Sequence, residues 1–296
     1  KEQGFLMRKE VVILIWSSDC MPALPEVETV KNALKAKLVG RVILSALVYW
    51  DNIIAYPSRK EFEEKIKNQR INFLERRGKF ILFVLDDYIL ISHLRMEGKY
   101  YFKDKDYLKS KHNHVIFTLD NDTLLVYDDT RKFGKMYLIE KDKIDKVGPL
   151  SKLGCEPFSF ELNVSYLRKK YKNKKLPIKT VLLDQSIITG IGNIYADEIL
   201  YLSKINPLTK ALDLTDDNLD DIITNTRCVL NNAISLGGTS IHSYKSVDGI
   251  SGKFQNYLLV HGKEGSSCNV CMEKIVKIKV GGRGTYYCPN CQKLKK

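Results

Sequence analysis

MPALPEVETVKNALKAKLVG (residues 21–40) opens with two prolines and continues as an amphipathic helix. Pro25 fits the first helical position, where its missing N–H has no partner to lose, and Gly40 ends the pattern. The helix therefore carries an apolar stripe that must cover another element. Pro22 is either a plain lead-in to this helix or the intended first residue of the protein. The stripe consists of Val27, Val30, Leu34 and Leu38.

The chain after this helix is rich in short apolar runs. Acidic turn signals at residues 86–87 and 120–122 separate neighbouring runs, which favours antiparallel hairpins. We expect a β-sandwich or a flattened barrel with the first helix against it. The six runs are VILSALVYW (42–50), KFILFVL (79–85), YILISHL (88–94), HVIFTL (114–119), TLLVYDD (123–129) and KMYLIE (135–140).

The composition changes between residues 148 and 160, where Gly-Pro and Cys-Glu-Pro predict a linker. Residues 161–236 then read as helices. The clearest is TDDNLDDIITNTRCVLNNAISLGG (215–238), with Thr215 as its cap. Short strands return from about residue 254, around the last cysteines. The chain is therefore expected to be α+β.

The 296-residue chain carries 48 Lys and Arg against 35 Asp and Glu, a net charge of +13. The excess is concentrated in residues 168–179 and 253–296. A solvated lysine-rich face would explain either run alone, but both together favour a polyanionic partner. No stretch approaches the ~20 apolar residues that span a bilayer, and no secretory signal is evident. We expect a cytoplasmic protein with no membrane partner.

Four of the seven cysteines form two C-x2-C pairs, with sixteen residues between the pairs. Because each pair fits a tight turn and four thiolates complete one tetrahedral site, the spacing predicts one structural zinc ion. A redox pair is the weaker alternative. Between the pairs, VGGRGTYYC places Arg283 at the tip of an expected hairpin, where it is either solvated or able to enter a groove. The predicted ligands are Cys268, Cys271, Cys288 and Cys291.

Three further motifs are each, on their own, weak evidence for a function. GIGNIYADE (190–198) joins a glycine-rich turn to a helix. The helix N-terminus and Asn193 suit a phosphate, although a tight helix–helix turn needs the same glycines. The other two motifs are HLRMEG (93–98) and DDTRKFG (128–134). Taken alone, Met96 and Phe133 would be core residues and Arg131 a surface charge.

Taken together, the motifs resemble the formamidopyrimidine-DNA glycosylases over nearly the whole chain. The matching motifs, in order, are MPALPEVETV, RRGKF (76–80), HLRMEG, KHNH (111–114), DDTRKFG, LLDQSIITGIGNIYADE and the cysteine pairs.

The resemblance implies an N-terminal β-sandwich with a flanking helix, a helix–two-turns–helix domain and a C-terminal zinc finger. Damaged double-stranded DNA would lie between the lobes, and we expect a monomer. The expected domains are the catalytic sandwich at 21–150, the DNA-binding helices at 151–253 and the finger at 254–296. An extension at 1–20 is not expected in the mature enzyme.

The resemblance also gives Pro22 a role, since these enzymes use an N-terminal proline as nucleophile. An α-amine has a pKa near ~8, so a useful fraction is neutral at physiological pH. As a secondary amine it forms an iminium with C1′ of the sugar, and this electron sink lets the 3′ and then the 5′ phosphate leave. Inside a peptide the nitrogen is an amide and cannot attack.

Further residues take their roles from the same resemblance. Lys79 matches the lysine that assists β-elimination, and Arg283 matches the finger-tip arginine of δ-elimination and phosphate contact. Glu26 and Glu198 match acidic residues near the active site, and Glu198 is a candidate for the lesion pocket. Met, Arg and Phe residues fill the gap that the flipped nucleotide leaves. The expected DNA-binding residues are His112, Arg131, Lys174, Asn193, Met96 and Phe133.

Two departures from the family pattern stand out. Ala23 occupies the position of a glutamate that acts as general acid and base, and twenty residues precede Met21. We expect a bifunctional glycosylase and abasic-site lyase of base excision repair that acts on 8-oxoguanine and formamidopyrimidines. The alternative is a catalytically impaired protein that binds lesions or abasic sites. The sister branch for oxidised pyrimidines and a zinc-ribbon module unconnected with repair explain less of the sequence.

Overall fold

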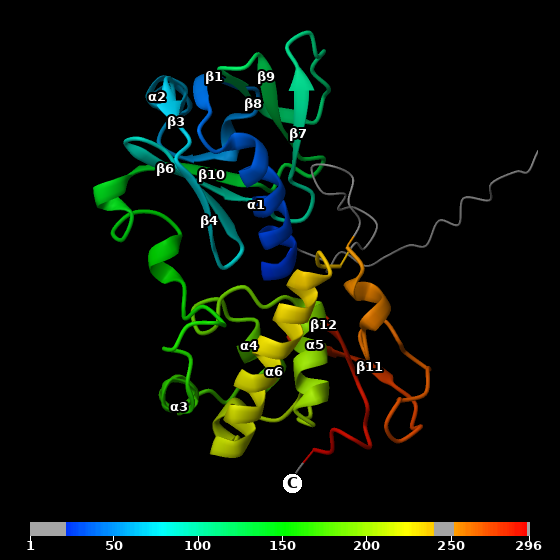
Figure 1. The fold of residues 1–296 in the computed structure, drawn as a ribbon. Coiled ribbons are helices and arrows are strands. Elements are labelled where there is room, and N and C mark those ends of the chain that lie inside the picture. The colour runs from blue at the N-terminus through cyan, green and yellow to red at the C-terminus, as the bar shows by residue number, and fades with distance from the viewer. Residues whose placement is uncertain (1–21, 240–251, 295–296) are drawn as a thin grey trace, which may run out of the picture.

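The computed structural model describes residues 22–239 and 252–294, so the expected extension at residues 1–20 lies outside the described residues. Figure 1 shows two lobes. The upper lobe holds the strands of the first half of the chain. The lower lobe holds the helices of the second half and, in orange and red, the segment with the cysteines.

Two five-stranded sheets form the upper lobe. Their strands are β1 (Val42–Val48), β2 (Ile54–Tyr56), β3 (Gln69–Arg70), β4 (Phe73–Arg77), β5 (Phe80–Val84), β6 (Tyr88–His93), β7 (Lys99–Asp104), β8 (Asn113–Leu119), β9 (Thr123–Asp128) and β10 (Lys135–Glu140). The strand order is β3-β1-β8-β9-β7 in one sheet and β2-β10-β6-β5-β4 in the other. The pairings are antiparallel except that of β2 with β10.

All six predicted strands are present, and both predicted hairpins turn at the acidic signals. The sandwich is therefore confirmed. The sequence does not predict the short strands β2 and β3, nor β4 and β7. β4 buries only Leu74 and β7 only Tyr100, so neither strand shows an apolar run. Half-buried charged and aromatic residues in both strands interrupt the alternation of buried apolar and exposed polar residues that marks a strand.

α1 (Leu24–Leu38) begins one residue earlier than predicted, with Ala23 as its N-cap. Alanine has no side-chain acceptor for the first turn. The Glu26 carboxylate closes this turn instead by accepting the Ala23 N–H at 2.9 Å. The predicted apolar stripe is buried throughout. α1 packs against β4 and β5 and also against α6 (Asp216–Ser235), so it joins the two lobes (Figure 1).

The lower lobe is helical, as predicted. Thr215 caps α6 by accepting the Asn218 N–H. The glycine-rich turn before residue 193 leads directly into a helix, which also agrees with the sequence. The remaining helices in the described residues are α2 (Arg59–Lys65) in the upper lobe and α3 (Val164–Tyr171), α4 (Ile178–Leu182) and α5 (Asn193–Leu202) in the lower one. Short 3-10 turns lie at Asp51–Ile53, Lys141–Lys143, Leu150–Lys152, Ala211–Asp213 and Phe254–Tyr257.

The finger is a hairpin of β11 (Val276–Val280) and β12 (Arg283–Tyr287). It turns through Gly281 and Gly282, both with positive φ. A Cβ on Gly281 would lie 2.7 Å from Thr180 Oγ1, so only glycine lets the turn approach α4 this closely. Arg283 therefore lies at the tip of a hairpin, as predicted, and this tip is held against the helical lobe.

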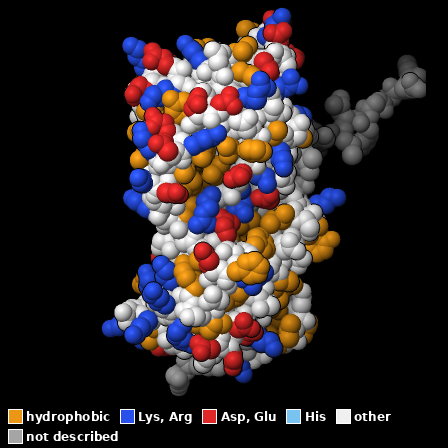
Figure 2. All heavy atoms as spheres, turned by 60° about the vertical axis from the view of Figure 1, so that its left-hand side comes forward, with side chains coloured by type: hydrophobic (Ala, Val, Ile, Leu, Met, Phe, Trp, Pro, Cys, Tyr) orange, Lys and Arg blue, Asp and Glu red, His pale blue; other side chains and the backbone are white. Residues whose placement is uncertain are grey.

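The fold is α+β, with the sandwich, flanking helix, helical domain and finger that the sequence predicts. On the face shown in Figure 2, basic side chains occur over both lobes and alternate with acidic and hydrophobic ones. Within residues 22–239 and 252–294, no helix combines the length and the apolar character needed to span a bilayer.

Candidate active site and metal site

The four finger cysteines converge as predicted. Their Sγ atoms all lie within 4.8 Å of one another, with 3.8 Å between Cys268 and Cys291 and 3.4 Å between Cys271 and Cys288. A tetrahedral zinc with Zn–S distances of about 2.3 Å sets its sulfurs about 3.8 Å apart, so these thiols fit a zinc ion. They are too far apart for disulfides. Four protein thiolates leave no position for a reactive water, so a metal here is structural.

Cys268→Ser is expected to release the metal and loosen the hairpin, because small zinc domains depend on their ligands to fold. Zinc content of the purified protein and proteolysis of the finger measure both effects. The matched control is Cys228→Ser, because Cys228 is an exposed thiol outside the cluster. Full zinc retention by Cys268→Ser would remove this residue from the site.

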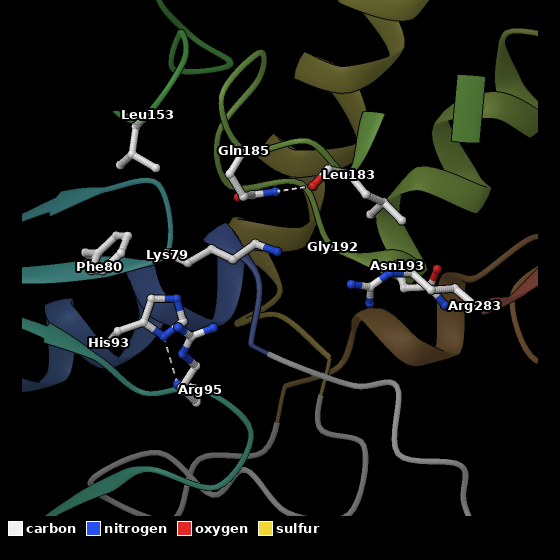
Figure 3. A pocket seen from close by; sticks show the side chains of 10 residues that line it. All are labelled: Lys79, Phe80, His93, Arg95, Leu153, Leu183, Gln185, Gly192, Asn193 and Arg283. Atoms are coloured by element: carbon white, nitrogen blue, oxygen red, sulfur yellow. Dashed lines mark hydrogen bonds between the residues drawn. The ribbon is translucent and has the colours of Figure 1, made fainter. Parts of the chain in front are cut away.

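A cavity of about 140 Å³ lies where the lobes and the finger meet (Figure 3). Lys79, Arg95 and Arg283 bring three cations to its wall, and none of the described residues that line it is acidic. An anionic ligand is therefore favoured. The other lining residues are Phe80, His93, Leu153, Leu183, Gln185, Gly192 and Asn193. The structure thus brings together three predicted site residues that are far apart in the sequence: Lys79, Asn193 and Arg283.

Lys79 projects into this cavity from the turn between β4 and β5 (Figure 3). Gly78 adopts a φ of +56° there, and a Cβ on it would overlap Thr189. Glu156 anchors the turn, since its carboxylate accepts the Gly78 N–H at 2.6 Å and an Arg77 N–H at 3.0 Å. The linker between the lobes therefore fixes the position of Lys79.

The pKa of Lys79 is lowered to about 8. Burial is the main cause, the Arg283 charge adds to it, Glu26 opposes it, and Arg95 adds a smaller repulsion. A lysine in water has a pKa near 10.4 and is almost fully charged at neutral pH. A useful fraction of Lys79 is therefore a neutral amine under physiological conditions.

Lys79→Met is expected to stabilise the fold. The folded-state pKa of about 8 against the ordinary 10.5 means that the charged lysine destabilises the native state below pH 8. At 1.36 kcal/mol per pKa unit, the gain at pH 7 is up to about 3 kcal/mol. The gain should shrink as the pH rises from 8 to 10.5, because the wild-type lysine then becomes neutral in the unfolded chain too.

Urea unfolding at pH 7 and at pH 10 tests this expectation. Lys67→Met is the control, since Lys67 is an exposed lysine of the same lobe. Equal midpoints for wild type and Lys79→Met at pH 7 would show that Lys79 is not buried as a cation.

His93 and Arg95 form the part of the cavity wall that lies below Lys79 in Figure 3. His93 Nδ1 accepts the Arg95 N–H at 3.0 Å, so the proton of the neutral ring is on Nε2. Burial, together with the Arg95 and Lys79 charges, lowers the pKa of His93 to about 3, which keeps the ring neutral. Both residues belong to HLRMEG, but the sequence reasoning singles out only Met96 from this motif.

α5 directs its N-terminus at the cavity, with Gly192 as N-cap and Asn193 in the first turn. The sequence suggests the Asn193 side chain as a phosphate donor. In the structure its Nδ2 donates to Gly284 O of β12 at 2.9 Å. Asn193 therefore docks the hairpin that carries Arg283, while the backbone at the start of α5 faces the cavity.

Lys179 is a buried residue that the sequence reasoning misses. Its Nζ donates to Asn193 O at 2.8 Å and pairs with Asp197 at 2.5 Å. Lys174, the predicted DNA contact in the same basic run, is half-buried and pairs with Asp184 at 3.6 Å. The apolar neighbours of Lys179 in PIKTVLL were the available signal, since they mark a buried helix.

The N-terminus of α1 contacts the glycine-rich turn before α5, and this turn lines the cavity. The Leu24 N–H donates to Gly190 O at 2.9 Å. The Cβ of Ala23 packs against Gly192, where an added Cβ would lie only 2.7 Å away. The segment that begins at Pro22 is therefore packed against the turn that lines the cavity.

Glu26 is held by several donors at this junction. Its carboxylate accepts hydrogen bonds from the Ala23 N–H, the Tyr195 hydroxyl, and both the N–H and the hydroxyl of Thr239. These donors come from α1, α5 and the segment after α6. Glu26 thus holds the start of α1 in the lower lobe.

Three family models match the chain. The formamidopyrimidine-DNA glycosylase N-terminal domain matches residues 21–136, and the formamidopyrimidine-DNA glycosylase H2TH domain matches residues 153–245. A zinc finger found in FPG and IleRS matches residues 265–294. The chain belongs to the formamidopyrimidine-DNA glycosylase family.

Similar proteins cover almost the whole chain. The formamidopyrimidine-DNA glycosylase of Oceanobacillus iheyensis is 44% identical over 276 residues, 93% of this chain and 99% of that protein. Lactococcus lactis Fpg, solved in complex with DNA that contains an abasic site, is 38% identical with a TM-score of 0.85. A mutant of the same Fpg, solved with Fapy-dG-containing DNA, has a TM-score of 0.86 and the same identity. Both structures cover 92% of this chain and 100% of their own.

This member of the formamidopyrimidine-DNA glycosylase family presents part of its motif trio at the surface. Arg131 and Phe133 lie in the exposed loop after β9, with the guanidinium 5.0 Å from the ring centroid. Phe133 is 50% exposed, so it is not the core residue that its sequence alone suggests. Met96 is half-buried after β6, and His112 is half-buried before β8.

Glu198 does not line the cavity in this family member. Its carboxylate accepts the N–H groups of Leu259, Val260 and His261 at 2.7–3.0 Å. It therefore ties α5 to the segment that leads into the finger. Its expected place in a lesion pocket stays a prediction, as do the roles of Lys174 and His112.

Proposed function

We propose that this protein is a bifunctional DNA glycosylase and abasic-site lyase of base excision repair. It acts as a monomer on damaged double-stranded DNA, removes 8-oxoguanine and formamidopyrimidines, and cleaves the abasic site by β,δ-elimination. Membership of the family supports the glycosylase class. The observation that carries the finer proposal is the convergence of Lys79, Arg283 and the start of α1 on one cationic cavity.

Pro22 is the proposed nucleophile once it is the first residue. Its secondary amine attacks C1′ of the sugar, the bond from C1′ to the base breaks, and the base leaves with a proton. The nitrogen then loses its proton, and its electron pair forms the C1′=N⁺ bond of an iminium as the C1′–O4′ bond breaks and the ring oxygen takes up a proton. The iminium accepts the electron pair released when C2′ loses a proton, and the enamine that results expels the 3′ phosphate. A second proton loss, at C4′, expels the 5′ phosphate. Water then hydrolyses the adduct and frees the amine.

Lys79 and Arg283 are proposed to serve the elimination steps. The neutral fraction of Lys79, with its pKa of about 8, can accept a proton during β-elimination. The guanidinium of Arg283 can hold a departing phosphate through two N–H groups. Both side chains line the cavity from opposite sides, Lys79 from the upper lobe and Arg283 from the finger (Figure 3).

The exposed loop residues are proposed to open the duplex. Phe133 would wedge into the base stack, Met96 would occupy the vacated space, and Arg131 would face the orphaned base. One zinc ion, held by the four cysteines, would keep the finger hairpin rigid so that Arg283 reaches the same place in every complex. The zinc takes no part in the chemistry.

Position 23 decides between this proposal and its alternative. Alanine cannot donate or accept a proton, and protonation of Glu26 would weaken the hydrogen bonds that its carboxylate accepts from four donors. We propose that Glu26 holds the start of α1 and does not move the proton. A catalytically impaired protein that binds lesions or abasic sites is therefore the second candidate.

Incision of end-labelled duplexes tests the function. The protein that begins at Pro22 is incubated with duplexes that contain 8-oxoguanine, a formamidopyrimidine, an oxidised pyrimidine or an abasic site. Nicking of the abasic duplex that leaves 3′-phosphate ends is expected, since both eliminations then occur. Tight binding without any nicking would favour the alternative, and absence of binding would reject both. Faster excision of the oxidised pyrimidine would overturn the lesion preference.

A further inference from the structure

We propose that Tyr49, Trp50, Lys109 and Lys132 form a second DNA-contact surface, which binds phosphates of the undamaged strand. We call these four residues the lysine–aromatic strip. The inference deepens the proposed function and rests on it, because it takes Arg131 and Phe133 to enter the duplex beside the strip.

The strip is assembled from three segments at one end of the β1-β8-β9 sheet. Tyr49 and Trp50 directly follow β1, and the Tyr49 N–H donates to His114 O at 2.8 Å. Lys109 lies in the loop before β8, and Lys132 lies in the loop after β9. The two loops are joined where the Asp129 N–H donates to His112 O at 3.0 Å.

Each lysine is held over an aromatic ring. Lys109 Nζ lies 4.6 Å from the centroid of Tyr49, and Lys132 Nζ lies 4.1 Å from the centroid of Trp50. Lys109 Nζ also donates to Ser110 O at 3.4 Å. An ammonium group has three N–H donors, so donors of both lysines remain available to a phosphate. The contact also restricts a flexible side chain in advance, which reduces the entropy that binding would otherwise lose.

The charge around the strip favours a polyanion. Among the described ion pairs, none contains Lys109 or Lys132. Three carboxylates that adjoin these segments in the chain are already engaged. Asp51 pairs with Arg59 at 3.0 Å, Asp128 accepts an Asn113 N–H, and buried Asp129 accepts the N–H groups of Arg131 and Gly134. A solvated lysine face usually carries carboxylates interspersed with its lysines, and here they face other partners.

The position of Lys132 indicates which strand is bound. It lies in the chain between Arg131 and Phe133, and all three residues are exposed. If Phe133 wedges into the stack and Arg131 faces the orphaned base, the phosphates next to Lys132 belong to the strand that carries this base. The strip would extend the contact along that strand, away from the cavity.

The test is the salt dependence of binding to a duplex that carries a tetrahydrofuran abasic analogue. Each lost phosphate contact lowers the slope of log K against log salt by about 0.9. Lys109→Gln with Lys132→Gln is therefore expected to lower the slope by about 1.8, with an unchanged melting temperature. The matched control is Lys67→Gln with Lys141→Gln. Lys67 adjoins β3, which pairs with the start of β1, and Lys141 follows β10 at the end away from the strip.

A second duplex with neutral methylphosphonate linkages in the undamaged strand tests the strand assignment. On this duplex the double variant and wild type should show the same slope. A persistent difference would place the contacted phosphates on the damaged strand and overturn the assignment. Equal slopes for wild type, double variant and control on ordinary DNA would overturn the strip itself. Failure of wild type to bind the analogue would instead reject the proposed function.

A substitution of Tyr49 tests the role of the aromatic rings. Tyr49→Leu keeps both lysines, so the slope should stay the same, while binding weakens about two- to five-fold through loss of an exposed cation–π contact. Wild-type affinity in Tyr49→Leu would show that the ring does not position Lys109.

Discussion

Borohydride is expected to trap the protein that begins at Pro22 on abasic DNA and to trap none of the form in which residues 1–21 are still attached. Reduction captures the Schiff base, and only an amine can form it. In the longer form the Pro22 nitrogen is an amide whose lone pair is delocalised into the carbonyl, so the loss should be essentially complete. Initiation at Met21 followed by methionine removal would expose the amine.

A form that begins at Met21 is the sharpest control, because it differs from the active form by one residue and leaves the described fold untouched. Mass spectrometry of each preparation defines its first residue, and denaturing gels count the adduct. An adduct with the intact 296-residue form would contradict the assignment of Pro22. Lys79 is the other partly neutral amine at the cavity, so loss of that adduct in Lys79→Met would identify Lys79 as the nucleophile.

The sequence predicts those parts of the fold whose residues are strongly patterned. The central strands bury continuous apolar runs, α6 has a cap and an apolar stripe, and the four cysteines have a spacing that suits one metal. β4 and β7 escape prediction because each buries a single residue. The start of α1 is displaced by one residue because Glu26, rather than a cap side chain, closes its first turn.

The site is predicted less completely, because its geometry depends on burial and on contacts between distant segments. The order of the motifs predicts three site residues that do line one cavity: Lys79, Asn193 and Arg283. Within the run of lysines only the apolar neighbours of Lys179 indicate that it is buried, and the DNA-contacting role of Lys174 stays a prediction. Burial also sets the pKa of Lys79, and no sequence pattern reports it directly.

Ala23→Glu is expected to separate the two half-reactions of the protein that begins at Pro22. Excision of an intact base needs proton transfer as the glycosidic bond breaks, and a positioned acid or base is typically worth ~10²–10⁴-fold. An abasic site has already lost its base and presents an aldehyde, so Pro22 can form the Schiff base with less help. Excision of 8-oxoguanine should therefore rise by a factor in that range, while nicking of abasic DNA should change far less.

The surroundings of position 23 make this substitution informative. Ala23 is 2% exposed and its Cβ packs against Gly192, which lines the cavity, so a longer side chain there would start beside the cavity wall. Ala23→Gln is the matched control, since it has the shape of glutamate without an ionisable group. One gel compares the wild type and the two variants on the 8-oxoguanine duplex and on the abasic duplex. Equal gains from Glu and Gln would attribute the effect to packing rather than to proton transfer. Efficient excision by the wild type itself would show that another group, with Glu26 the nearest carboxylate, already carries the proton.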